Sequence, residues 1–329
     1  MNPLFAMRID LTNSVLDSTR RVVELSTHVT IDHAAIGSFC TDQYLLTFPH
    51  WLEAAPVDFE TYDSLSRLSF LLLFNALSFR YWGEPKWSTS YNGASYDGSW
   101  GMIAAIAKAD QDGLPILDSH SWSSITDNQF RCMLTGNVVI PRFDSRLNIF
   151  RELGTQLQAS FNGNIQRLLS QGNYDALSIT DTIIATFKSF DDSAVYRGVP
   201  VHFRKRAQLF VSDVARTIDD DSLGRIKHTD KLTAAADYKL PWILRRLGIL
   251  RYDPSLAARI DRRLLLKPSS EEEIEIRACT IWAVQYIVEQ LHRRLPSLCA
   301  IDVNDVLWLM SQAHKPNDEP YHLCDTTAY

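Results

Sequence analysis

The sequence has little glycine and proline and no long hydrophobic run. Glycine and proline each account for 13 of the 329 residues, which is too few for the turn-rich chain of a β-sandwich or barrel. No apolar stretch approaches the length of about 18 residues that a membrane-spanning helix needs. Arg8 and Asp10 interrupt the segment where a signal peptide would need an apolar run. These absences predict a soluble, cytoplasmic protein that does not bind membranes.

Cysteine and positive charge are also limited. The five cysteines are odd in number and never form a CxxC pair, which favours reduced thiols over a disulfide framework or a zinc site. With 33 Lys and Arg against 39 Asp and Glu, the formal net charge is −6. That balance argues against binding to a nucleic-acid polymer, whose backbone needs a broad basic surface.

The common catalytic motifs are missing. The chain contains no GxGxxG, GxxxxGK[ST], HExxH or GxSxG pattern, so dinucleotide, P-loop, metalloprotease and serine-hydrolase chemistry has no support. The nine histidines are scattered without the close spacing of metal ligands. We therefore predict neither a cofactor nor a metal, and expect carboxylates, lysines and aromatic side chains to perform any chemistry.

Apolar residues recur mostly at helical spacing, and period-2 alternation is scarce. Short strands are predicted only at residues 137–141 and 199–203. The pattern predicts an all-α fold and argues against a Rossmann fold or TIM barrel. The length alone allows one or two domains, and with the motifs below we expect one compact helical domain spanning residues 1–329. The predicted helices cover residues 13–28, 62–80, 100–110, 146–169, 180–190, 205–218, 241–247, 254–266, 271–294 and 303–314.

Three consecutive cations, Arg204, Lys205 and Arg206, lead into an apolar helix in the segment FRKRAQLFVSDV (203–214). On a helix, Lys205 and Asp213 would lie within roughly 80° of one face. The cluster could be a solvated helix start. However, cations at a helix N-terminus oppose the helix dipole, and a bound phosphate would relieve that conflict.

Asp237 follows three alanines in the segment AAADYKLPWILRRLG (234–248) and precedes Tyr238. One interpretation is that Asp237 caps the helix beginning near Pro241. The other is a carboxylate held in a mainly apolar pocket, where it could stabilise or attack a cation.

Aromatic residues cluster at residues 74–87 and 96–101. Core packing is the default interpretation for most of them. A planar heteroaromatic ligand would also need such faces, with an amide such as that of Asn75 to read the polar edge of the ligand.

Together these segments resemble the queuosine salvage family of queuosine 5′-phosphate N-glycosylase/hydrolases. The resemblance runs from about Tyr62 to the C-terminal residues, while residues 1 to about 60 match poorly. Asn75 departs from the acid that the family pattern implies at its position. The strongest stretches are FRKRAQLFVSDV (203–214), AADYKLPWILRRLG (235–248), EIEIRACTIWAV (273–284) and LWLMSQAH…PYHLCDTTAY (307–329).

The resemblance implies an all-α fold similar to helical DNA glycosylases. It also implies hydrolysis of the N-glycosidic bond of queuosine 5′-monophosphate, which releases queuine, a 7-deazaguanine base, for tRNA modification. Asp237 falls on the acid of the family's ADY(R/K)LP motif and Lys205 on the lysine of its KRAQ motif. Asp237 is then expected to stabilise or attack the ribosyl cation, while Lys205, helped by Arg204 or Arg206, binds the 5′-phosphate.

The remaining assignments are less direct. Phe74, Trp100 and Tyr96 are expected to stack on or enclose the base, and Asn75 to contact it. Tyr238 and Asp213 are expected nearby. Two other classes stay open on the sequence alone: a helical protein that binds nucleic acid or removes a base from DNA or tRNA, and a small-molecule binding protein without catalysis.

Overall fold

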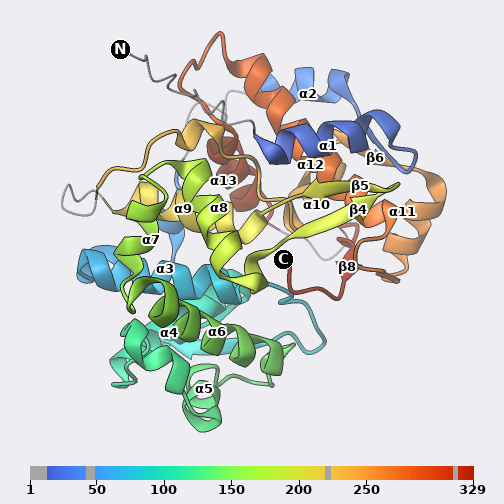
Figure 1. Ribbon diagram of the computed structural model, residues 1–329. Coiled ribbons are helices and arrows are strands. Elements are labelled where there is room, and N and C mark those ends of the chain that lie inside the picture. The colour runs from blue at the N-terminus through green and yellow to red at the C-terminus, as the bar shows by residue number, and fades with distance from the viewer. Residues whose placement is uncertain (1–12, 42–48, 219–223, 314–317) are drawn as a thin grey trace, which may run out of the picture.

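The computed structural model describes residues 13–41, 49–218, 224–313 and 318–329. The predicted mainly helical fold is confirmed, with short strands between the helices (Figure 1). The α-helices are α1 (Ser14–Leu25), α2 (His33–Cys40), α3 (Ser64–Leu77), α4 (Gly98–Gln111), α5 (Asp127–Met133), α6 (Phe143–Phe161), α7 (Ile165–Gln171), α8 (Ala176–Thr186), α9 (Lys205–Thr217), α10 (Lys239–Arg246), α11 (Pro254–Asp261), α12 (Glu271–Leu291) and α13 (Ala300–Met310). Short 3₁₀ helices are η2 (Trp51–Ala54), η3 (Phe59–Thr61), η4 (Ser119–Ser124), η5 (Lys188–Phe190) and η6 (Thr229–Lys231).

The helix boundaries follow local capping chemistry. Ser270 accepts a hydrogen bond from the Glu273 amide and starts α12 with three glutamates in its first turn, where the helix dipole favours negative charge. The predicted helix at 146–169 is two helices, because Asn162 and Gly163 both have positive φ and end α6. That conformation suits asparagine and glycine and stops a right-handed helix.

The strands form four two-stranded sheets within the described residues. Their pairs are β1 (Val29–Ile31) with β6 (Leu250–Tyr252), β2 (Ser88–Tyr91) with β3 (Ala94–Asp97), β4 (Ser193–Tyr196) with β5 (Val199–His202), and β7 (Leu265–Leu266) with β8 (Leu323–Cys324).

One of the two strand predictions is confirmed and the other is wrong. The predicted strand at 199–203 is β5, one half of the β4–β5 hairpin. The predicted strand at 137–141 is wrong. This segment is a loop, which the Asn137 side chain holds in place by hydrogen bonds. Its Oδ1 accepts the Ser88 amide and its Nδ2 donates to the Lys86 carbonyl.

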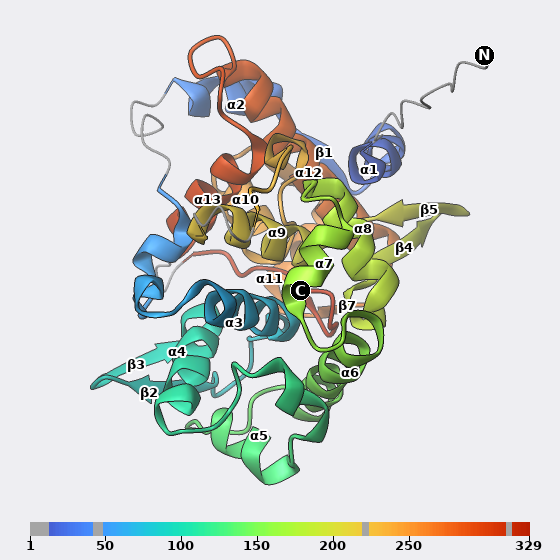
Figure 2. The same ribbon diagram turned by 60° about the vertical axis from the view of Figure 1, so that its left-hand side comes forward.

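The core has two large parts. In both ribbon views helices α4–α6 gather at one end of the molecule and α1, α2 and α12 at the other (Figures 1 and 2). One hydrophobic cluster includes α3, α4 and α6, and the second is built from α2, α10, α12 and α13. α9 packs against α3 from the first cluster, and α10 packs against α13 in the second. The candidate site lies where these two clusters meet.

The early part of the chain is tied to its late part. Glu275 on α12 is fully buried, and its Oε2 accepts hydrogen bonds from Ser26, Thr27 and His28 at 2.7–3.0 Å. Its Oε1 accepts the Tyr196 hydroxyl at 2.7 Å. Together with the β1–β6 pair, these bonds fix residues 26–31 against α12.

Candidate active site

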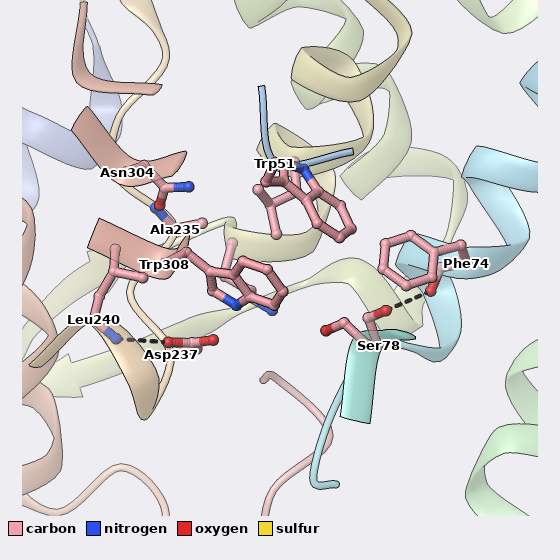
Figure 3. A pocket seen from close by; sticks show the side chains of 11 residues that line it. Trp51, Phe74, Ser78, Ala235, Asp237, Leu240, Asn304 and Trp308 are labelled. Carbon is pink, nitrogen blue, oxygen red and sulfur yellow. Dashed lines mark hydrogen bonds between the residues drawn. The ribbon is translucent and has the colours of Figure 1, made fainter. Parts of the chain in front are cut away.

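An aromatic slot lies between α3, α9, α10 and α13, and Figure 3 shows the side chains that line it. The slot and its opening to solvent together hold about 410 Å³ of empty space. Its lining residues are Trp51, Phe74, Ser78, Ser99, Lys205, Leu209, Ala235, Asp237, Leu240, Asn304 and Trp308. Most are apolar or aromatic, so the slot suits a flat, largely apolar ring system.

Three tryptophans from distant segments make the aromatic wall. The Trp51 and Trp100 rings are stacked, with centroids 5.2 Å apart. Trp308 meets both rings edge-on, at 5.2 and 5.0 Å. Phe74 lies 5.5 Å from Trp51. Such packing holds the rings rigidly and leaves the faces of Trp51, Phe74 and Trp308 at the slot.

Asp237 has two roles divided between its oxygens. Oδ1 accepts the amides of Lys239 and Leu240 at 2.7 and 3.1 Å and thereby caps α10 (Figure 3). Oδ2 has no hydrogen-bond partner among the residues that the structure describes. The three preceding alanines are each buried and bring the chain close to α12 and α13. The cap therefore fixes the carboxylate while one oxygen stays available to a ligand.

Lys205 is the cation of this site. It is the first residue of α9, and its side chain is only 6% exposed although it lines the slot. Within the described ranges, its ammonium group has neither a hydrogen bond nor an ion pair closer than 4.0 Å. Burial lowers the pKa of Lys205, and the nearby Asp237 carboxylate opposes that shift. Lys205 and Asp237 therefore interact across the slot without neutralising one another in a direct pair.

A buried ion pair links the backbone at these two residues. Arg277 on α12 donates two hydrogen bonds to Asp192, at 2.8 and 2.6 Å. Its Nε donates to the Ala236 carbonyl at 3.1 Å, next to Asp237. Asp192 in turn accepts the Lys205 amide at 3.2 Å. Burial alone would lower the pKa of Arg277, but its pairing with Asp192 raises it. The pair thus sets the separation between the segments that carry Asp237 and Lys205.

A polar chamber adjoins the slot, and together with its opening to solvent it holds about 470 Å³ of empty space. It shares Ser78, Ser99, Lys205, Asp237 and Trp308 with the slot. Its further lining residues are Phe79, Tyr81, Lys86, Asp97, Gly98, Trp100, Tyr238, Lys239, Gln312 and Tyr329. Asp237 and Lys205 therefore stand at the junction of an apolar and a polar compartment.

The structure brings only some of the predicted site residues to these compartments. Phe74 lines the slot, Trp100 and Tyr238 line the chamber, and Asp237 and Lys205 line both. Burial raises the pKa of Tyr238 well above its ordinary value, so its phenol keeps its proton and can donate it.

Other predicted residues lie elsewhere. Asn75 is fully buried behind the slot, where its Nδ2 donates to Asp213 at 2.8 Å. Arg204 pairs with Asp181, and Arg206 donates to the backbone carbonyls of Ala76 and Ser189. These side chains and Tyr96 are absent from the described lining of both compartments.

Asp213 supports the aromatic wall from behind. This fully buried carboxylate accepts the Trp51 indole N–H at 2.9 Å and the Asn75 amide. His50 Nε2 lies 3.7 Å from both Asp213 and Asp305. Burial raises the pKa of Asp305 to about 7. Asp213 therefore orients a ring of the slot without lining the slot itself.

Sequence reasoning missed Trp51, Trp308 and Asn304. Trp51 belongs to the part of the chain where the resemblance is poor. Asn304 and Trp308 are four residues apart on α13, and Asn304 also accepts the Ala235 amide at 2.9 Å. The sequence could have indicated Asn304 and Trp308 by their i, i+4 spacing, which places the amide and the indole on one face of a helix.

Within the described part of the chain, no three His, Cys, Asp or Glu side chains come together to hold a metal ion. None of the helices in the described residues is both long and apolar enough to cross a membrane.

The fold and the site define a mainly helical protein that encloses a two-compartment pocket with a carboxylate and a lysine at its centre. The sequence model of the queuosine salvage protein family matches residues 59–329. The chain belongs to this family.

Similar proteins include queuosine 5′-phosphate N-glycosylase/hydrolases from three organisms. The protein of Sphaerobacter thermophilus is 38% identical, over 96% of this chain and 97% of its own length. That of Dictyostelium discoideum is 28% identical over the full length of both chains. That of Mus musculus is 27% identical, over 93% of this chain and 96% of its own.

Proposed function

We propose that this chain hydrolyses the N-glycosidic bond of queuosine 5′-phosphate. Water is added across the bond, so the products are queuine and ribose 5-phosphate. The observation that carries the proposal is the buried Asp237 carboxylate, whose Oδ2 is free at the junction of an aromatic slot and a polar chamber. The relatives named for this reaction support the choice of substrate.

The reaction needs negative charge beneath the sugar. As the bond between C1′ and the base breaks, positive charge develops on the ribose ring, and a fixed anion lowers the barrier. A 7-deazaguanine has no basic N7, so protonation at that position cannot assist departure of the base. Asp237 supplies the anion, and either attacks C1′ itself or activates the attacking water. Its capping bonds to α10 fix it in place before substrate arrives.

The slot and Lys205 position the substrate. The planar base fits between Phe74 and the tryptophan wall, which holds C1′ at the junction. Lys205, with its ammonium group unpaired in the described structure, contacts the 5′-phosphate from the inner side. Binding energy from this non-reacting group would then align the sugar for reaction.

The proposal extends to the setting of the enzyme. We place it in the cytoplasm as one domain, with a mononucleotide as substrate and no direct binding of nucleic-acid polymers. The net charge of −6 supports the last point, because polymer binding needs a basic surface that contacts several phosphates. A salt-dependent gel shift with tRNA would contradict it.

Mass spectrometry of queuine release from queuosine 5′-phosphate tests the activity. Asp237→Asn keeps an oxygen for the α10 cap but removes the charge, so we expect at least a ~100-fold loss of kcat with little loss of stability. Asp32→Asn is the matched control, because Asp32 caps α2 through two amides at 2.9 Å and lies outside the described lining of both compartments. Full activity of Asp237→Asn would refute the role of the carboxylate, and no release by the wild type would refute the function.

A further inference from the structure

Residues 318–329 lie where the two hydrophobic clusters meet, and the proposed chemistry does not use their side chains. In both ribbon views the C-terminal end of the ribbon lies in the middle of the molecule, between the two groups of helices (Figures 1 and 2). On one side α10 holds the segment. The Trp242 indole N–H donates to the Glu319 carbonyl, and Arg245 pairs with the Glu319 carboxylate at 3.1 Å. β8 also pairs with β7.

On the other side two arginines hold the segment. Asp325 Oδ1 accepts the Nε–H groups of Arg80 and Arg142 at 3.0 and 2.9 Å. The Arg80 amide donates to the Tyr329 carbonyl at 2.9 Å. Both arginines have positive φ, 43° and 54°, and a side chain other than glycine keeps such an angle only where its surroundings hold it. Residues 318–329 are therefore fixed to both halves of the core.

This anchoring inserts the Tyr329 ring beside the buried Arg277 pair. Tyr329 is 2% exposed, and its hydroxyl lies 3.2 Å from His322 Nε2. Burial lowers the pKa of His322 to about 3, so the imidazole is neutral when it contacts the phenol. The Arg277 guanidinium lies 3.9 Å from the centroid of Phe203 and 4.6 Å from that of Tyr329. Aromatic rings therefore hold this cation in addition to its carboxylate partners.

Arg277 connects this contact to the residues of the candidate active site. Its Nε donates to the Ala236 carbonyl, and Asp192, its ion-pair partner, accepts the Lys205 amide. A guanidinium is planar, so a ring against its face restricts rotation of the plane and with it the direction of the Nε–H. The Tyr329 ring thereby keeps the Nε–H pointed at Ala236, the residue before Asp237.

We propose that Tyr329 is a positioning residue for the hydrolysis, whose ring fixes the plane of the Arg277 guanidinium and through it the places of Asp237 and Lys205. This rests on the proposed function, since the reaction is assigned there to Asp237 and Lys205. A catalytic group misplaced by about 1 Å can cost about a hundredfold in rate. Even a small rotation of Arg277 should therefore be measurable in kcat.

The test compares Tyr329→Met and Tyr329→Phe with wild type on queuosine 5′-phosphate. Tyr329→Met removes the ring, so kcat should fall about tenfold to thirtyfold while KM stays within about threefold. Tyr329→Phe keeps the ring and should retain at least about a third of kcat. Phe143→Met is the matched control, because the Phe143 ring lies 4.6 Å from the Arg131 guanidinium and outside the described lining of both compartments.

A double mutant separates positioning from a general loss of packing. Lysine at position 277 offers no flat face to a ring. In the Arg277→Lys background, Tyr329→Met should therefore lower kcat by less than about threefold more. Losses that multiply in full would overturn the inference, and so would a rise of KM without a fall of kcat, which would mean that the ring contacts the substrate itself.

Hydrogen exchange separates this inference from the proposed function, because it needs no substrate. The amides of Lys239 and Leu240 are bonded to Asp237 Oδ1. Tyr329→Met should speed their exchange and Phe143→Met should not. Unchanged exchange would overturn the positioning role whatever the activity. Faster exchange, in a protein whose wild type releases no queuine, would keep the positioning role and refute the hydrolysis. Tyr329→Leu takes the place of Tyr329→Met if the latter does not fold.

Discussion

Removing the Arg277 guanidinium should destabilise the protein more than removing its partner Asp192. Arg277 is 3% exposed and faces two buried carboxylates, Asp192 at 2.6 Å and Glu273 at 3.7 Å. Arg277→Met leaves both acids uncompensated, and breaking a buried pair in this way costs about 3–5 kcal/mol. Asp192→Asn leaves Arg277 beside Glu273 and should cost about 1–3 kcal/mol. The structure thus predicts an asymmetry between two variants of one ion pair.

The contact between Arg277 and Glu273 also determines how the stability of Arg277→Met depends on pH. Burial raises the pKa of Glu273 above its ordinary 4.5, and Arg277 opposes the shift. Without Arg277 the pKa of Glu273 rises further, so the folded state binds a proton that the unfolded state has released. Stability of Arg277→Met should therefore fall as pH rises above about 4.5, and its deficit relative to wild type should be larger at pH 8 than at pH 5.

Urea titrations of both variants at the two pH values measure these free energies of unfolding. A cost for Arg277→Met below about 1 kcal/mol, or one smaller than that of Asp192→Asn, would refute the reasoning. The ion pair also supports the backbone at Ala236 and Lys205. We therefore expect Arg277→Met to lower kcat under conditions where it is folded, and Arg277→Lys to recover only part of it, because lysine cannot make the bidentate contact.

Two further predictions concern stability. Asp305→Asn should stabilise the protein by up to about 4 kcal/mol at pH 8. The reason is that burial raises the pKa of Asp305 from 3.8 to about 7, and the wild-type protein must ionise this buried carboxyl at pH 8. Urea titrations should show the gain fading towards pH 4, and a gain independent of pH would contradict the prediction. Gly154→Ala should cost about 1–3 kcal/mol, because a Cβ there would overlap backbone atoms of Ser123 and Trp122 in η4. Thermal unfolding measures this against Gly37→Ala, whose added Cβ meets only the Gln290 side chain at 3.6 Å; equal stability of the two variants would show that η4 can move away.

The sequence was sufficient for most long helices, because their amphipathic period and caps are local. It also indicated Asp237 and Lys205, whose motifs carry the resemblance. The sequence could not show which of two adjacent residues faces the pocket, since successive side chains on a helix point about 100° apart. Phe74 therefore reaches the slot while Asn75 is buried behind it. In the same way Lys205 faces the pocket, and Arg206 donates to carbonyls elsewhere.

Other features depend on contacts that no local pattern encodes. The sequence did not predict α2 or the strands β1 and β6, because all three are short. They gain their stability from packing against α12, and the two strands also from pairing with each other. Trp51 is held at the slot by long-range contacts, among them the hydrogen bond from its indole N–H to Asp213, 162 positions later. Whether the fold is similar to that of helical DNA glycosylases stays a prediction.

The anchoring of residues 26–31 on α12 has a consequence for synthesis of the chain. The amides of Thr27 and His28 find their acceptor, Glu275, about 250 positions later. At a ribosomal rate of about 5–20 residues per second, those groups emerge roughly 12–50 s before their partner. During that interval α1 has no α12 to pack on, and its apolar face stays exposed. The N-terminal segment must therefore dock late, and a nascent chain halted before α12 should depend on chaperones far more than the complete one.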